Sequence, residues 1–103
     1  MRIVTRPDFD GIVCAVLLYQ AENIDTDIKW VEPNEIQKEK ANILKGDIMA
    51  NLPYSPNCSL WFDHHISNKP KGNFQGAFDI APSAARVIYE YYKEKGKLDN
   101  RYD

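Results

Sequence analysis

The sequence predicts an α/β domain in which a mainly parallel sheet of four or five strands carries helices on both faces. Short apolar runs, rich in β-branched and aromatic residues, alternate with a helical pattern or with longer polar connections. Strands separated in this way favour parallel pairing, because the chain must cross over one face of the sheet between them. The 103 residues are enough for one compact domain and too few for two.

The first strand and the first helix follow each other closely. Residues 3–5 are β-branched and end before Pro7, which is typical of a short buried strand. Apolar residues recur at helical spacing over residues 11–20, and Asp10 is a candidate N-cap for this helix. Gly11 leaves room at the start of the helix, where free backbone amides can help to hold an anion.

Three further strands are predicted in the middle of the chain. Residues 28–31 form the second strand and stop at Pro33. The third strand covers residues 48–50 and the fourth residues 59–62, with two prolines turning the connection between them. The polar segment 34–45 fits either a short helix or a loop.

A loop and a final helix complete the predicted order of elements. Residues 69–76 are rich in Pro, Asn and Gly and therefore predict a loop. Pro82 stands where the first turn of the last helix is expected, and apolar residues continue at helical spacing as far as Tyr92.

Polar residues come directly after three of the predicted strands. Asp8 follows the first, Asn51 the third and Asp63 the fourth. Open α/β sheets bind ligands beyond the carboxyl ends of their strands. We therefore expect these three side chains to converge on one edge of the sheet.

The residue types at this edge predict metal-dependent chemistry. Asp8 and Asp10 point the same way if their segment is extended, and two adjacent carboxylates repel each other unless a proton or cation lies between them. Asp63, His64 and His65 add a carboxylate and two imidazoles, a ligand set that suits Mn, Fe, Co or Zn. Two such ions about 3.5–4 Å apart stabilise an in-line displacement at phosphorus and activate water. The set predicts hydrolysis of a phosphate bond.

Simpler explanations exist for each part of this set. A pair of acids before a helix is usually a cap and a solvated side chain, and adjacent histidines on a surface are usually incidental. Packing alone does not explain why the strongly apolar run 60–62 leads directly into Asp63 and the two histidines. The combination therefore favours a functional site.

Composition excludes several classes of partner. The formal net charge of −2 provides no general positive field for nucleic acid or an anionic membrane. The spacing of Cys14 and Cys58 fits neither a zinc site nor a disulfide framework, so both thiols are expected to be reduced. The sequence starts without a signal-peptide pattern, and no apolar run approaches the roughly 18 residues of a membrane span. We expect a cytoplasmic protein without a membrane partner.

The motifs resemble those of the DHH phosphoesterase superfamily. Residues 7–11 look like the first motif of that family, Asp63-His64-His65 is its eponymous tripeptide, and residues 82–85 follow at a compatible spacing. The family contains manganese- or magnesium-dependent pyrophosphatases, exopolyphosphatases, exonucleases, oligoribonucleases and cyclic-dinucleotide phosphodiesterases. The overall pattern is most similar to that of exopolyphosphatase-like members.

The resemblance implies a role for each matching residue. Asp8 would bind one metal ion, most readily Mn with Mg as the alternative, whereas Asp10 and His64 would bind a second. Asp63 would be a supporting acid, and His65 would contact the substrate phosphate. The implied catalytic set is therefore Asp10, Asp63, His64 and His65.

The sequence also departs from the family pattern. Val4 or Arg6 stands where most members carry a metal-binding His, and Arg6 becomes a candidate substrate-binding residue. The bridging Asp of the second motif corresponds either to Asn51 or to Asp47, depending on where the third strand lies. Neither the fourth-motif Asp nor the smaller carboxy-terminal substrate domain follows, so residues 1–103 are expected to be a truncated amino-terminal domain.

Two functions from different classes follow from these observations. The first is a metal-dependent phosphoesterase acting on a phosphate-containing small molecule or a short oligonucleotide. The second is a non-catalytic metal- or phosphate-binding domain, in which an ion pair of Arg6 with Asp8 replaces one cation. A purely structural domain is the third reading. An exposed sheet edge would allow a homodimer.

Overall fold

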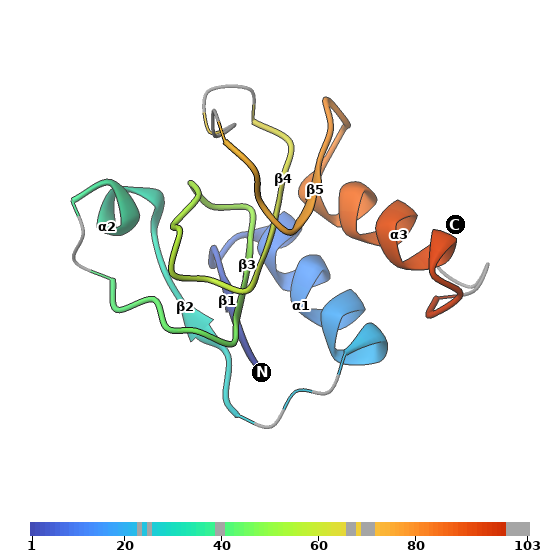
Figure 1. Ribbon diagram of the computed structural model, residues 1–103, viewed down its shortest axis with the longest axis horizontal. Coiled ribbons are helices and arrows are strands. Elements are labelled where there is room, and N and C mark those ends of the chain that lie inside the picture. The colour runs from blue at the N-terminus through green and yellow to red at the C-terminus, as the bar shows by residue number, and fades with distance from the viewer. Residues whose placement is uncertain (23, 25, 39–40, 66–67, 69–71, 99–103) are drawn as a thin grey trace.

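The computed structural model describes residues 1–22, 24, 26–38, 41–65, 68 and 72–98. Five strands form one parallel sheet in the order β2-β1-β3-β4-β5, which confirms the predicted fold class. The strands are β1 (Arg2–Thr5), β2 (Lys29–Trp30), β3 (Asp47–Ala50), β4 (Leu60–Asp63) and β5 (Gly76–Phe78). β1, β3 and β4 lie side by side in the middle of the sheet (Figure 1).

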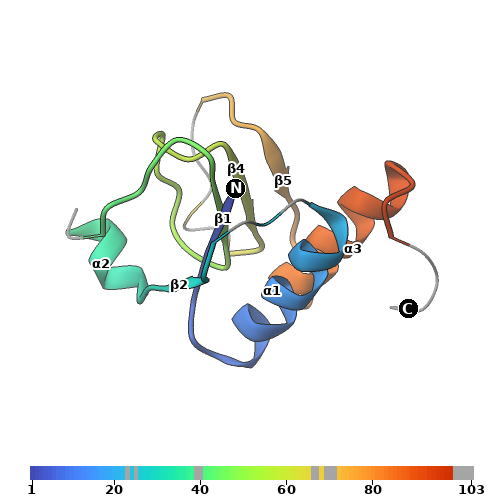
Figure 2. The ribbon, with the colours of Figure 1, turned by 90° about the horizontal axis from the view of Figure 1, so that it is seen from below.

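Helices lie on both faces of the sheet, as predicted (Figure 2). α1 (Phe9–Ala21) and α3 (Ala84–Glu94) pack beside each other on one face, and the five-residue α2 (Pro33–Gln37) lies on the other. Alternate strand residues supply the two cores, since side chains in a strand point to opposite faces in turn. In β4, Phe62 joins the α1–α3 core and Trp61 joins the core on the α2 side.

The first helix starts earlier than the sequence predicted. Asp8, and not Asp10, is the N-cap of α1: its backbone is extended and its side chain accepts the N–H of Gly11. Asp10 therefore lies within the first helical turn. The prediction failed because both acids are good N-cap residues and only the backbone conformation distinguishes them.

The remaining elements differ from the predictions at their boundaries. The polar segment 34–45 was predicted as either a short helix or a loop. Its first residues belong to α2, whose start is stabilised by a capping box between Glu32 and Glu35, and residues 41–45 form a loop. Ser83 caps α3 by accepting the N–H of Arg86, so Pro82 precedes the helix and does not lie in its first turn.

The sequence did not predict β5. Residue 76, assigned to the loop 69–76, begins this strand, while residues 69–71 of that loop lie outside the described part of the chain. The strand is short and half-buried, so it shows no period-two pattern, and it forms through pairing with β4. A Cβ at residue 76 would overlap the backbone of Trp61, so the glycine lets β5 lie this close to β4. β2 and β5 are the outer strands, and pairing with a second copy stays a prediction.

Candidate functional site

The carboxyl ends of the central strands bring the predicted polar side chains together. Asn51 follows β3, Asp63 ends β4, and Asp8 lies in the turn between β1 and α1. Because these strands are parallel and paired in register, their ends meet at one edge. The amide nitrogen of Asn51 lies 3.1 Å from Oδ1 of Asp8, which confirms that the ends of β1 and β3 converge.

Hydrogen-bond donors surround the carboxylate of Asp8. Its Oδ1 accepts the backbone N–H of Gly11 at 2.8 Å and the Nδ2 group of Asn51 at 3.1 Å. Nε of Arg6 lies 3.4 Å from Oδ2, and both side chains of this ion pair are partly exposed. The negative charge of Asp8 is therefore balanced by groups of the protein itself.

Gly11 leaves room at the start of α1, as the sequence predicted. Its amide is used by Asp8 and is not free for an anion. A Cβ at this position would overlap the carbonyl oxygen of Arg6, so only glycine lets the first turn of α1 approach this backbone. The hydroxyl of Thr5 lies 3.2 Å from the carbonyl oxygens of both Gly11 and Ala50, and thus joins the ends of β1 and β3 to α1.

Asn51 has an unusual backbone and an unpaired oxygen. Its φ of 60° lies in the left-handed region, which Asn tolerates better than most residues. The residue is 2% exposed, and its Oδ1 is the only buried side-chain nitrogen or oxygen without a hydrogen-bond partner in the described part of the chain. Buried polar atoms are normally paired, so this oxygen marks a place where a ligand or water is expected.

Asp10 connects α1 to the start of α3. Its Oδ2 accepts the N–H of Ala84 at 2.9 Å, and its Oδ1 accepts the N–H of Ala85 at 3.0 Å. The Cys14 thiol, one turn along α1, lies 3.8 Å from Oδ1. Burial, reinforced by Asp10, raises the pKa of Cys14, so this thiol remains a donor to the carboxylate. The amino end of α3 therefore holds Asp10 in one orientation.

His64 faces Asp10 with one ring nitrogen and the backbone with the other. Nδ1 lies 3.0 Å from the carbonyl oxygen of Ala81, which can only accept, so Nδ1 carries a hydrogen. Nε2 lies 3.6 Å from Oδ2 of Asp10. In the neutral imidazole, the lone pair of Nε2 is therefore directed at the carboxylate side of the site. A backbone carbonyl that fixes the tautomer in this way is typical of metal-binding histidines.

Asp63 supports the site from within the core. It is fully buried, its Oδ1 lies 2.8 Å from Nδ1 of His65, and its Oδ2 accepts the Nδ2 group of Asn68 at 2.7 Å. These contacts orient the imidazole of His65, whose side chain is 40% exposed and leaves Nε2 on the open side. Sequence reasoning missed Asn68, because nothing in its local sequence indicates a partner for a buried acid.

Asp47 does not belong to this edge, which corrects one of the two positions considered for the bridging acid. It begins β3 and therefore lies at the opposite end of the strand from Asn51. Arg2 binds it through two nitrogens, at 2.8 and 2.6 Å, and the N–H of Leu44 donates to it at 2.8 Å. Asp47 therefore forms a structural ion pair with Arg2, and this pair anchors the start of β1 to the start of β3.

The donor set fits a divalent metal best between Asp10 and His64. Ligand atoms of Asp63, His64 and His65 lie within 4.8 Å of one another, but Asp63 is fully buried and both of its oxygens have side-chain partners. Asp10 also accepts two backbone N–H groups, but its side chain is 21% exposed and its Oδ2 lies 3.6 Å from Nε2 of His64. Mixed oxygen and imidazole ligands suit Mn and its neighbours among the transition metals.

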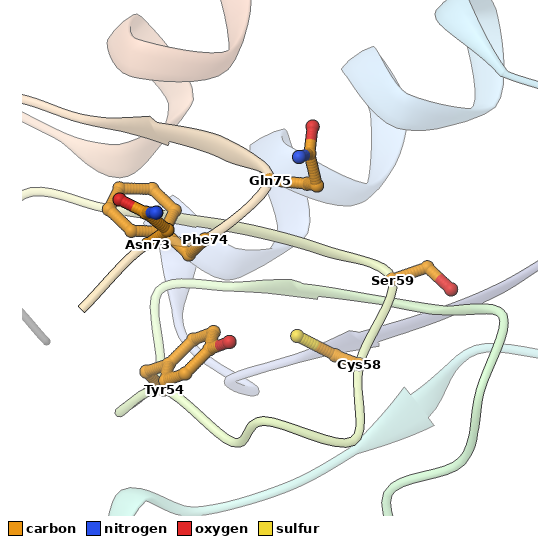
Figure 3. Close-up of a pocket in the computed structure, with 6 residues that line it drawn as sticks. All are labelled: Tyr54, Cys58, Ser59, Asn73, Phe74 and Gln75. Carbon is orange, nitrogen blue, oxygen red and sulfur yellow. The ribbon is translucent and has the colours of Figure 1, made fainter.

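A small pocket of about 200 Å³ lies away from this site (Figure 3). Tyr54, Cys58 and Phe74 face the same hollow from the segments that precede β4 and β5. Ser59 and Gln75, just before these strands, and Asn73 also line it. Burial raises the pKa of Cys58 to about 11, so this thiol is a poor nucleophile near neutral pH.

Comparison with known proteins found a likeness to a solved structure. No protein-family model matches the chain, and no curated protein sequence matches it. The structure is similar to that of the pGpG-specific phosphodiesterase PggH from Vibrio cholerae, with a TM-score of 0.80 and 45% sequence identity. The match covers 98% of this chain and 32% of that one, so the chain spans about a third of the length of PggH.

Among the described residues, no helix has both the length and the apolar character needed to cross a bilayer.

Proposed function

We propose that this chain is the amino-terminal, metal-binding part of a DHH-superfamily phosphoesterase that hydrolyses a phosphodiester bond in a short oligonucleotide. The observation that carries the proposal is the pair Asp10–His64, in which Oδ2 of the carboxylate and Nε2 of the imidazole lie 3.6 Å apart. The similarity to a phosphodiesterase specific for pGpG favours a nucleotide substrate. The exopolyphosphatase-like activity and the cytoplasmic location expected from the sequence remain predictions.

Asp10 and His64 would hold the metal ion, Mn in preference to Mg. When bound, such an ion supplies Lewis-acid polarisation of a phosphate oxygen and lowers the pKa of water. Asp10 is kept in place by the amides of Ala84 and Ala85, and His64 by the carbonyl of Ala81. Ligands held in this way need no rearrangement when the ion binds, which favours affinity.

His65 and Arg6 would contact the substrate. Asp63 keeps the hydrogen of His65 on Nδ1, so Nε2 faces outward and can accept a proton or, in the imidazolium form, donate to a phosphate oxygen. The guanidinium of Arg6 is more than one third exposed beside Asp8, so its remaining N–H groups are available to a phosphate.

A non-catalytic ligand-binding domain is the second candidate. It is favoured by the pairing of Arg6 with Asp8, which places a cationic side chain where a metal ligand would otherwise act. We also propose that substrate selection uses parts of the protein beyond this chain, since PggH is about three times as long.

Metal binding and turnover test the proposal separately. Titration calorimetry with MnCl₂ is expected to show binding to the chain, which Asp10→Asn and His64→Ala each abolish. Asp27→Asn removes an exposed carboxylate by the same chemical change and should leave binding intact. Release of GMP from pGpG, with polyphosphate and pyrophosphate as comparison substrates, is then measured for the protein at its natural length. Robust Mn-dependent turnover eliminates the non-catalytic candidate, whereas absence of Mn binding contradicts the proposed function.

A further inference from the structure

The two acids of the first motif have different side-chain neighbours. The guanidinium of Arg6 and the amide of Asn51 approach Asp8, whereas the imidazole of His64 approaches Asp10, which also accepts two backbone N–H groups. We infer that the site takes a single divalent cation, at Asp10 and His64, and that Arg6 and Asn51 replace a second cation at Asp8. This inference rests on the proposed metal-dependent function and specifies how many ions that function uses.

Groups of the protein already occupy the surroundings of the Asp8 carboxylate. Three N–H groups approach its carboxylate: the Gly11 amide at 2.8 Å, Nδ2 of Asn51 at 3.1 Å and Nε of Arg6 at 3.4 Å. A divalent ion at the same carboxylate would have to approach the positive charge of Arg6 closely. Like charges at such distances repel strongly, so the guanidinium opposes a second ion here.

Asn51 directs its amide nitrogen, and not its amide oxygen, toward Asp8. It therefore does not offer a metal-binding atom on the side of that carboxylate. Its Nδ2 lies 3.1 and 3.4 Å from the two oxygens of Asp8, so the side chain presents a donor to them. Rotating the amide by half a turn would place two acceptors against each other and lose this hydrogen bond. The unpaired Oδ1 therefore points away from the carboxylate, and the residue does not bridge two ions as a carboxylate would.

The surroundings of Asp10 favour a cation, because its side-chain neighbour is an imidazole and not a guanidinium. Nδ1 of His64 is committed to the carbonyl of Ala81, so neutral His64 directs a lone pair toward Oδ2 of Asp10. Two acceptors at 3.6 Å repel each other unless a cation lies between them or the ring is protonated. Asp10 therefore has a possible metal-binding imidazole beside it, where Asp8 has a guanidinium.

The number of ions bound tests the inference without relying on activity. Equilibrium dialysis against MnCl₂, followed by metal analysis, is expected to give one Mn per chain for the unaltered protein. The double variant Arg6→Gln with Asn51→Asp removes the guanidinium and adds a carboxylate, and it is expected to bind two. The remote pair Arg86→Gln with Asn57→Asp makes the same charge change at exposed positions and should still bind one.

The outcomes separate this inference from the proposed function. Two ions bound by the unaltered chain would overturn the single-cation inference and leave the metal-dependent function intact. No ion bound would overturn both. A double variant that keeps the native circular dichroism spectrum but still binds one ion would show that Arg6 and Asn51 do not exclude the second cation. If the double variant does not fold, the stoichiometry of the unaltered chain still decides.

Discussion

Nε2 of His64 lies 3.6 Å from Oδ2 of Asp10, and the segment that leads into α3 holds both side chains in this arrangement. The carbonyl of Ala81 fixes the imidazole, and the amides of Ala84 and Ala85 fix the carboxylate. The amino end of α3 is therefore a structural part of the candidate metal site, although it contributes no metal-binding side chain to it.

Replacing Asp10 by Asn is expected to destabilise the metal-free protein. The carboxylate accepts two backbone N–H groups, and an amide can offer only one oxygen to them. Loss of a charge-assisted hydrogen bond costs about 1.5–3 kcal/mol. Urea unfolding in the presence of EDTA measures the change, and Asp27→Asn is the exposed control. An unchanged midpoint for Asp10→Asn would show that these contacts do not stabilise α3.

Replacing Asn68 by Ala should weaken the support of the buried acid. Oδ2 of Asp63 accepts the Nδ2 group of Asn68 at 2.7 Å and would lose this donor inside the core. A buried polar atom left without a partner costs about 1–3 kcal/mol. Chemical unfolding should show a decrease of this size, whereas Asn57→Ala, at an exposed position, should change stability by less than about 0.5 kcal/mol. Equal effects of the two substitutions would contradict the role of Asn68.

Replacing Gly11 by Ala should be among the most damaging single-methyl changes in this chain. The new Cβ would overlap the carbonyl oxygen of Arg6, and a backbone atom cannot move aside as a flexible side chain can. We expect a loss of about 3 kcal/mol or more, at the upper end of overpacking effects. Gly72→Ala is the control, because nothing lies within 4 Å of the position of its Cβ and its φ is not positive. Thermal melts of the two variants should differ clearly; similar melting temperatures would refute the predicted overlap.

The thiol of Cys58 should react slowly with disulfide reagents at pH 8. Burial raises its pKa to about 11, so its thiolate fraction is about two hundredfold lower than that of a free cysteine. The pKa of Cys58 is raised in the folded state, so its ionisation opposes folding. The folded protein keeps its full stability below the ordinary pKa of the thiol, and this contribution is lost as the pH rises through about 11. Absorbance with Ellman's reagent measures the rate, with the urea-unfolded chain as the fully reactive control. Rapid native labelling of Cys58 in the Cys14→Ala variant would contradict the assignment.

The pattern of the sequence was sufficient to predict the α/β class, the three central strands and the edge that carries Asp8, Asn51 and Asp63. Each of these predictions depends on local information: a short apolar run, a proline or polar residue that ends it, and the general rule that parallel strands end at one edge. For the same reason, β5 was missed, since its pairing with β4 and not its own pattern makes it a strand.

Only the tertiary structure decided the partners of the site residues. Asp10 meets Ala84 and Ala85, His64 meets Ala81, and Asp47 meets Arg2 at the other end of the sheet. Hydrogen bonds between residues far apart in the sequence depend on packing and leave no periodic signal. The acids and histidines could therefore be recognised from the sequence, but the partner that each of them meets depends on how α1, α3 and the strand ends are brought together.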